Sequence, residues 1–303
     1  TALPMGSKSL EELLVKKKWF HLLPSIFLTE RPDVACSFLT EGHVAVIVDN
    51  SPAVLILPGG GYEYCSQRES EPAAMQFLAA GYQAFVLEYS TAEHAANWQP
   101  MIDAARAIVW MRSHAGALGL LPDKIAVCGF SAGGHLAAGT AILWDAGPVQ
   151  AALGADAGQN RPDAVVLSYP VVTSGPYGHQ GSFDCIAGGD AALRRQFSLE
   201  NQVRPGLPPF FIWHTVTDGT VPVENSMLLA SALRENQVPF ELHLMADGRH
   251  GMSLCTAEVH DPHPHNAHWF ALCREWLDDV FGYRAGADGD PDQPFFRHGG
   301  AKG

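Results

Sequence analysis

The stretch KIAVCGFSAGGH, from Lys124 to His135, contains a GxSxG pentapeptide with Ser131 at its centre. The apolar run Ile125 to Cys128 suits a strand, and the run from His135 to Leu143 is rich in alanine and leucine, which favours a helix. A serine at a sharp strand-to-helix turn is typical of a catalytic nucleophile, because the turn lifts its hydroxyl clear of the backbone. The alternative is an ordinary turn whose glycines serve only close packing.

Length and composition limit the number of domains that the chain can form. The chain has 303 residues, 47% of them hydrophobic, enough for one large domain, and it shows no repeat or linker. We expect a single domain over residues 1–283, with a small lid-like insertion at 173–205. The segment 284–303 is rich in glycine, aspartate and proline and is expected to be a flexible tail.

Charge and hydropathy disfavour several classes of binding partner. The formal net charge of −13 disfavours nucleic acid and anionic membranes as partners. No apolar run reaches 18 residues, and the start lacks the order of a secretory signal, so we expect a cytoplasmic protein. The six cysteines show no CxxC spacing, which indicates reduced thiols. A mature secreted form whose signal has been removed stays open.

Apolar runs alternate with helical segments, which predicts an α/β fold with a mostly parallel sheet of about eight strands and helices on both faces. The runs at 43–48 and 53–58, separated by a turn-rich break, are expected to form an antiparallel hairpin. Further strands are expected at 83–89, 164–172, 209–215 and 239–245, and further helices at 71–80, 100–114, 224–236 and 267–280.

Two later residues complete a triad with Ser131. Asp218 follows the run 209–215 and His250 follows the run 239–245, in the chain order serine, acid, histidine. In this assignment His250 takes the Ser131 proton and Asp218 orients the imidazole. Alone, Asp218 would be a turn or capping aspartate and His250 a loop histidine. The competing candidates are Asp247, Asp190 and His179. We call the turn at Ser131 the elbow, and His135 is expected to pack on the helix that follows it.

A second glycine motif, PGGGY at Pro58 to Tyr62, follows the run 53–58. The N–H groups of Gly60 and Gly61 are expected to join that of Ala132 as donors to a developing oxyanion. A phosphate loop is disfavoured, because neither GxxxxGK[ST] nor GxGxxG fits these residues. A purely structural glycine turn remains the alternative.

Together these residues resemble the α/β-hydrolase fold, in the esterase and lipase group related to hormone-sensitive lipase, and more narrowly small bacterial acetyl and xylan esterases. The likeness rests on PGGGY, on GFSAGGHLA and on the run from SLENQV to DGRHGMSL, within residues 45–280. It implies the same triad and oxyanion donors, no cofactor, and small acyl groups, often acetyl on a carbohydrate. The departure is Pro58, where many relatives carry a histidine that braces the oxyanion loop.

Other candidate sites are less specific. Tyr62, Tyr169 and Trp98 are candidates for lining the substrate pocket, with core packing as the alternative for each. The run HDPHPHNAH at 260–268 holds four histidines, but its two prolines keep it extended, so we expect a solvated loop and no metal.

The sequence therefore predicts a serine carboxylesterase that hydrolyses small acetyl-type esters, on carbohydrates such as acetylated xylo-oligosaccharides, with a small-molecule ester as its partner. Amide or peptide hydrolysis by the same triad is one alternative. A non-catalytic ligand-binding member of the fold is another. A homodimer stays open, because one sequence does not show which sheet edges are covered.

Overall fold

The computed structural model describes residues 26–27, 35–38 and 50–284. Their strands form one eight-stranded sheet in the order β1-β2-β4-β3-β5-β6-β7-β8. The strands are β1 (Ile26–Phe27), β2 (Ala35–Phe38), β3 (Ser51–Leu57), β4 (Gln83–Glu88), β5 (Leu120–Phe130), β6 (Ala164–Ser168), β7 (Phe210–Thr215) and β8 (Phe240–Met245).

Six neighbouring strands, β3 to β8, run parallel, while β2 is antiparallel to β4 and β1 to β2. This confirms the predicted mostly parallel sheet. The expected hairpin is wrong, because β3 pairs in parallel with β4 on one side and β5 on the other. No edge of β3 is left for an antiparallel partner. The strand expected at 43–48 lies outside the described residues.

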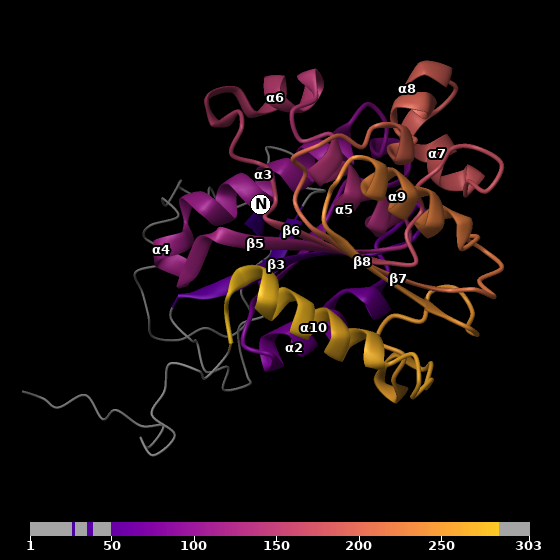
Figure 1. The fold of residues 1–303 in the computed structure, drawn as a ribbon. Coiled ribbons are helices and arrows are strands. Elements are labelled where there is room, and N and C mark those ends of the chain that lie inside the picture. Colours follow the sequence, from indigo (N-terminus) through magenta and orange to yellow (C-terminus); the bar gives the residue numbers. More distant parts are fainter. Residues whose placement is uncertain (1–25, 28–34, 39–49, 285–303) are drawn as a thin grey trace, which may run out of the picture.

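Helices cover both faces of the sheet, as Figure 1 shows. The helices α2 and α10 lie on one face, and α3, α5 and α9 on the other. Alternate side chains of β3 point to opposite faces, so Val54 and Ile56 belong to one core and Leu55 and Leu57 to the other. The bounds are α2 (Glu71–Ala79), α3 (Gln99–Ser113), α4 (Ala115–Leu118), α5 (Ala132–Ile142), α6 (Gly147–Leu153), α9 (Glu224–Glu235) and α10 (His268–Phe281).

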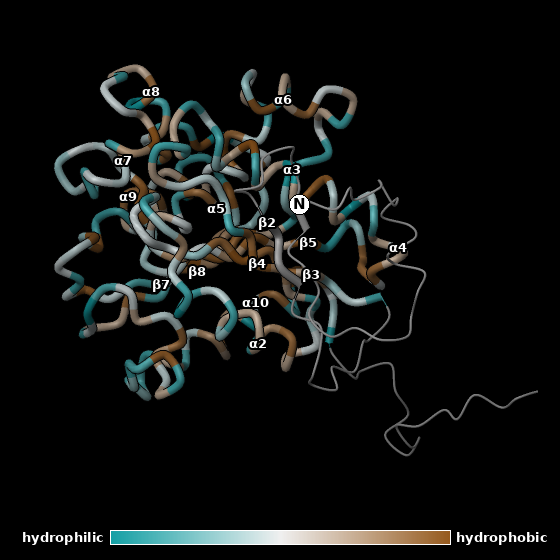
Figure 2. Tube along the Cα trace, turned by 180° about the vertical axis from the view of Figure 1, so that it is seen from behind, coloured by the Kyte–Doolittle hydropathy of each residue, from teal (hydrophilic) through white to brown (hydrophobic). Residues whose placement is uncertain are grey.

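The strands are hydrophobic on both faces, and Figure 2 shows them as a brown layer in the middle of the molecule. All seven residues of β3 and all six of β7 are buried. Such continuous apolar runs are typical of parallel strands covered on both sides. Four predicted helices, α2, α3, α9 and α10, begin and end within one residue of their expected bounds. Strand β6 ends four residues early, because Tyr169 takes a positive φ of 40° and turns the chain.

The stretch 173–205 holds two short helices, α7 (Gln180–Ala187) and α8 (Ala191–Gln196). Both lie on the same side of the sheet as α5 and α9 (Figure 1). The five cysteines whose side chains are described are free thiols, as expected for them. No helix in the described part of the chain is long and apolar enough to cross a membrane.

Candidate active site

Ser131 lies on the sharp turn between β5 and α5, with φ 54° and ψ −120°. A φ of this sign is strained for a residue with a side chain. The turn requires small neighbours: a Cβ atom at Gly133 would lie 2.0 Å from the carbonyl oxygen of Leu57, and one at Gly129 would lie 2.1 Å from that of Gly133. Gly133 therefore lets the end of β3 approach this turn, and Gly129 lets the start of α5 pack against the end of β5.

Three loops at the carboxyl edge of the sheet bring Ser131, His250 and Asp218 together. The Ser131 Oγ lies 2.7 Å from the Nε2 of His250, and the His250 Nδ1 lies 2.7 Å from the Oδ2 of Asp218. Ser131 is 9% exposed, and the side chains of His250 and Asp218 are 16% and 0% exposed. Since the carboxylate accepts the Nδ1–H, the Nε2 is left as the acceptor for the serine proton.

Asp218 is held as a carboxylate. Burial raises its pKa, but hydrogen bonds from His214 and His250, and from the Val221 backbone, outweigh burial and leave the pKa well below its usual range. Its Oδ1 accepts the N–H groups of Thr220 and Val221, both at 2.9 Å. The Oδ2 faces the Nδ1 of His250 and, at 3.3 Å, the Nε2 of His214.

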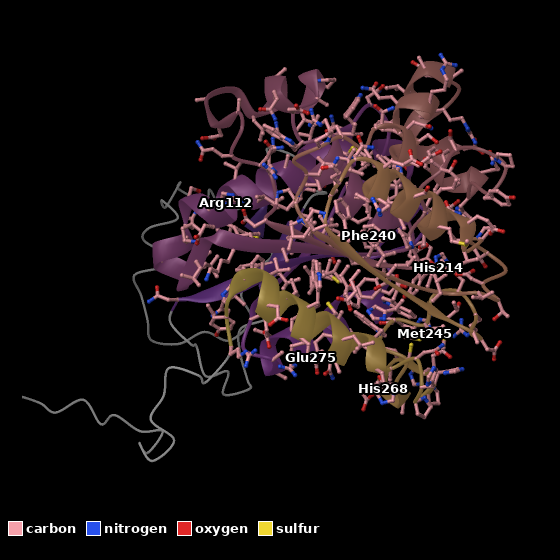
Figure 3. The ribbon with its side chains drawn as sticks, viewed as in Figure 1. Arg112, His214, Phe240, Met245, His268 and Glu275 are labelled. Atoms are coloured by element: carbon pink, nitrogen blue, oxygen red, sulfur yellow. The ribbon has the colours of Figure 1, made fainter. Side chains whose placement is uncertain are left out.

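The sequence did not single out His214, which the structure places beside the acid. Figure 3 labels it near the carboxyl end of β7, on the same side as Met245 at the end of β8. Its Nε2 lies 3.0 Å from the Val221 carbonyl, which can only accept, so this nitrogen carries the proton. Its Nδ1 lies 2.8 Å from the Ser226 Oγ. His214 therefore presents an N–H donor to Asp218, and only its place near the end of an apolar run hinted at this.

The PGGGY loop packs beside the elbow. Gly60 and Gly61 take φ values of 126° and 67°, which glycine adopts without strain. Within residues 50–284, the N–H groups of Gly60, Gly61 and Ala132 donate to no protein acceptor. N–H groups without a protein acceptor are one property that an oxyanion hole needs.

The three candidate pocket residues are buried. Tyr62 is 0%, Tyr169 1% and Trp98 5% exposed. The Tyr62 hydroxyl lies 2.8 Å from the Nδ1 of His135, and the ring of Trp98 packs edge-on against Phe197. Their burial supports the core-packing alternative over contact with substrate.

The competing candidates lie elsewhere or serve other contacts. Asp190 accepts the N–H groups of Ala192 and Leu193 as the cap of α8. Asp247 is exposed and accepts a hydrogen bond from Thr217 at 3.0 Å. His179 caps α7, and its Cε1 would lie 3.9 Å from a Cβ at Gly61, which puts this ring beside the oxyanion loop.

The histidine run at 260–268 forms a loop that leads into α10. His260 and His265 are exposed, and the His268 Nδ1 donates to the His265 carbonyl at 3.0 Å. In the part of the chain that the structure describes, no three His, Cys, Asp or Glu side chains are grouped to hold a metal ion.

His135 makes the stability of this region depend on pH. It is completely buried on α5, as expected, with its Nε2 2.7 Å from the Phe197 carbonyl. Burial lowers its pKa from 6.5 to about 4, an effect that the hydrogen bond to Phe197 only partly offsets. Between these values the unfolded chain binds a proton that the folded chain does not, so acid destabilises the fold.

We expect this group to lower the free energy of unfolding by about 2 kcal/mol between pH 7 and pH 4.5. Urea unfolding at both pH values measures it. The loss should be smaller by that amount in His135→Gln, and it should persist in His265→Gln, which changes an exposed histidine. An equal acid loss in wild type and His135→Gln would show that another group causes it.

Two family models match parts of this chain. A family model described as BD-FAE matches residues 45–174, which include the PGGGY loop and the elbow. A second model, described as Bacillus/Clostridium GerA spore germination protein, matches residues 2–78. The two matches overlap at residues 45–78.

Among solved structures, an acetyl ester-xyloside bifunctional hydrolase from Caldicellulosiruptor lactoaceticus is 35% identical with a TM-score of 0.70, and the match covers 82% of this chain and 88% of that one. Among curated proteins, endo-1,4-beta-xylanase B of Butyrivibrio fibrisolvens is 40% identical over 68% of this chain. The acetylxylan esterase of Xylanibacter ruminicola is 29% identical over 67% of it. The matches span only 33% and 42% of these two curated relatives.

Proposed function

Because this chain belongs to the esterase and lipase group of the α/β-hydrolase family, we propose that it hydrolyses carboxylic esters through an acyl-enzyme at Ser131. The observation that carries the proposal is the pair of 2.7 Å contacts that link Ser131 to His250 and His250 to Asp218. A nucleophile, a base and an orienting acid in this order are the parts that acyl transfer needs.

In the proposed acylation, the Ser131 Oγ attacks the carbonyl carbon of the ester while its proton moves to the Nε2 of His250. The imidazolium that forms is stabilised by the Asp218 carboxylate at Nδ1. The carbonyl oxygen becomes an oxyanion, and the N–H groups of Gly60, Gly61 and Ala132 donate to it. His250 then returns the proton to the departing alcohol as the carbon–oxygen bond breaks.

Deacylation repeats these steps with water. His250 takes a proton from water, whose oxygen attacks the acyl carbon, and the same N–H groups hold the second oxyanion. The proton then returns to the Ser131 Oγ, the bond to the serine breaks, and the acid leaves. No cofactor enters these steps.

We further propose that the acyl group is small, of the acetyl type, and that the alcohol is a carbohydrate such as an acetylated xylo-oligosaccharide. The names of two similar proteins support this. The similar proteins include one named as an acetylxylan esterase and one named as an acetyl ester-xyloside hydrolase.

The test is hydrolysis of p-nitrophenyl esters from acetate to decanoate, with p-nitroacetanilide and an acetylated xylo-oligosaccharide in parallel. We expect kcat/KM to be highest for the acetate and acetate to be released from the oligosaccharide. A preference for decanoate would contradict the small acyl group. Activity on aryl acetates without release from the oligosaccharide would contradict the carbohydrate alcohol.

The same experiment separates the alternatives. Faster cleavage of the anilide than of the acetate ester would favour amide hydrolysis. A folded protein that cleaves neither would contradict the hydrolase proposal and favour a ligand-binding member of the fold.

A further inference from the structure

A short turn, Gln67–Glu69, contacts the PGGGY loop and the loop that carries His250, and Tyr169 joins it to the loop after β6. We propose that Arg68 and Glu69 are positioning residues, which fix the oxyanion loop and the His250 loop relative to Ser131. This inference rests on the proposed hydrolase activity. Neither residue is needed as a proton donor or acceptor in the steps above.

Glu69 is a buried acid with both oxygens engaged. It is only 3% exposed. Its Oε2 accepts the N–H of Gly59 at 2.9 Å, and its Oε1 accepts the hydroxyl of Tyr169 at 2.7 Å. A carboxylate is rarely buried without such donors. Glu69 therefore joins the loop after β3 to the loop after β6.

Gly59 lies between this carboxylate and the nucleophile. A Cβ atom at Gly59 would lie 2.6 Å from the Glu69 Oε2 and 2.9 Å from the Cβ of Ser131. The next residue along the chain is Gly60, whose N–H is a proposed oxyanion donor. Because Gly59 is fixed on both sides, the carboxylate sets where the Gly60 N–H lies relative to the Ser131 Oγ.

The network continues to the loop that carries His250. The Tyr169 hydroxyl, which donates to Glu69, accepts the N–H of Ser253 at 2.8 Å. Its ring packs edge-on against the imidazole of His250, with 5.1 Å between the ring centroids. One side chain thus contacts both the bracing carboxylate and the proposed base.

Arg68 holds the same loop from the other side. Its guanidinium donates to the Gly251 carbonyl at 3.0 Å, and its own carbonyl accepts the Ser253 hydroxyl at 2.6 Å. Gly251 directly follows His250 in the chain. The two neighbouring residues of the turn therefore brace both sides of the site.

Glu69→Gln tests the proposal with the smallest change in shape. A glutamine has one acceptor oxygen where the carboxylate has two, so an NH₂ group must face either the Gly59 N–H or the Tyr169 hydroxyl. We expect kcat on p-nitrophenyl acetate to fall about 10- to 100-fold with KM within about twofold. The pH dependence of kcat/KM should keep its position, because the His250–Asp218 pair is intact.

The matched control is Asp278→Asn. Asp278 accepts the hydroxyl of Tyr82 at 2.7 Å, so it forms another buried tyrosine–carboxylate pair. Tyr82 directly precedes β4, at the opposite edge of the sheet from Ser131. We expect this variant to lower the Tm with kcat unchanged. A comparable loss of kcat in the control would show that the Glu69→Gln effect comes from a less stable fold, and it would overturn the proposal.

A second variant keeps the test decisive if Glu69→Gln folds poorly. Tyr169→Phe removes the other partner and can be measured alone. Where both single variants fold, they can be combined, and in the double variant the glutamine NH₂ no longer faces a hydroxyl. The combined loss of kcat should therefore be smaller than the product of the two single losses. If Glu69→Gln, or Tyr169→Phe in its place, keeps kcat within twofold of wild type, the positioning role is wrong.

Labelling of Ser131 by a fluorophosphonate separates this proposal from the proposed function, since it needs no ester substrate. If the wild type cleaves no ester, the function fails while labelling still reports on the site. A labelling rate that falls about 10- to 100-fold in Glu69→Gln supports the positioning role. An unchanged rate overturns it.

Discussion

Ser131→Ala is expected to lower kcat on p-nitrophenyl acetate by about 10⁶, with the protein fully folded. The variant removes the only atom that forms the covalent bond to the acyl group, while the oxyanion donors and the His250–Asp218 pair remain. KM should change little, because the hydroxyl acts mainly in the transition state. Initial rates at high enzyme concentration, with fluorophosphonate labelling in parallel, measure the loss.

Ser113→Ala is the control, because Ser113 is an exposed serine at the end of α3 that hydrogen-bonds its neighbours Trp110 and His114. It should keep full activity and labelling. If Ser131→Ala retained more than a hundredth of the wild-type rate after a contaminating esterase had been excluded, Ser131 would not be the nucleophile.

The elements that carry the site could be predicted because their signals are local. The pentapeptide around Ser131 combines glycines, an apolar run and a helix-forming run within about twenty residues, so no distant contact was needed to place it. Asp218 and His250 were then found from topology alone, since the carboxyl ends of parallel strands meet at one edge of a sheet. The structure brings these three side chains within hydrogen-bond distance.

The residues that support the site could not be predicted, because their environment is made by segments far apart in the chain. Glu69 looks like an ordinary acid before a helix, and it becomes a buried brace only when Tyr169, 100 residues later, reaches it. Tyr62 looks like a pocket residue in the sequence, but in the fold it is buried and its hydroxyl contacts His135, 73 residues later.

The predicted hairpin was wrong for the same reason, because the partners of β3 lie far from it in the chain. A turn-rich break between two apolar runs is a local signal, whereas both neighbours of β3 come from later in the chain. Parallel pairing needs long connections, and sequence periodicity gives no information about which strands they join.

Asp218→Asn is expected to lower kcat by about 10⁴ near neutral pH. The Oδ1 of Asp218 accepts two backbone N–H groups, which will hold the amide oxygen of the asparagine in that place. Its NH₂ group then replaces the Oδ2 and faces the Nδ1 of His250, which lies 2.7 Å away. His250 can accept this bond only by carrying its proton on Nε2, where it cannot take the proton of Ser131. The pH–rate profile of kcat/KM with p-nitrophenyl acetate measures the loss.

Asp247→Asn is the matched control, because Asp247 is the rival acid nearest to His250 in the sequence and its exposed carboxylate accepts a hydrogen bond from Thr217. Its kcat should stay within about twofold of wild type, the range expected for a surface substitution. The reverse result, with activity lost in Asp247→Asn and kept in Asp218→Asn, would move the acid of the triad to Asp247. Loss in Asp218→Asn alone would show that the carboxylate held by the loop after β7 orients His250, since the two variants make the same chemical change and differ only in its position.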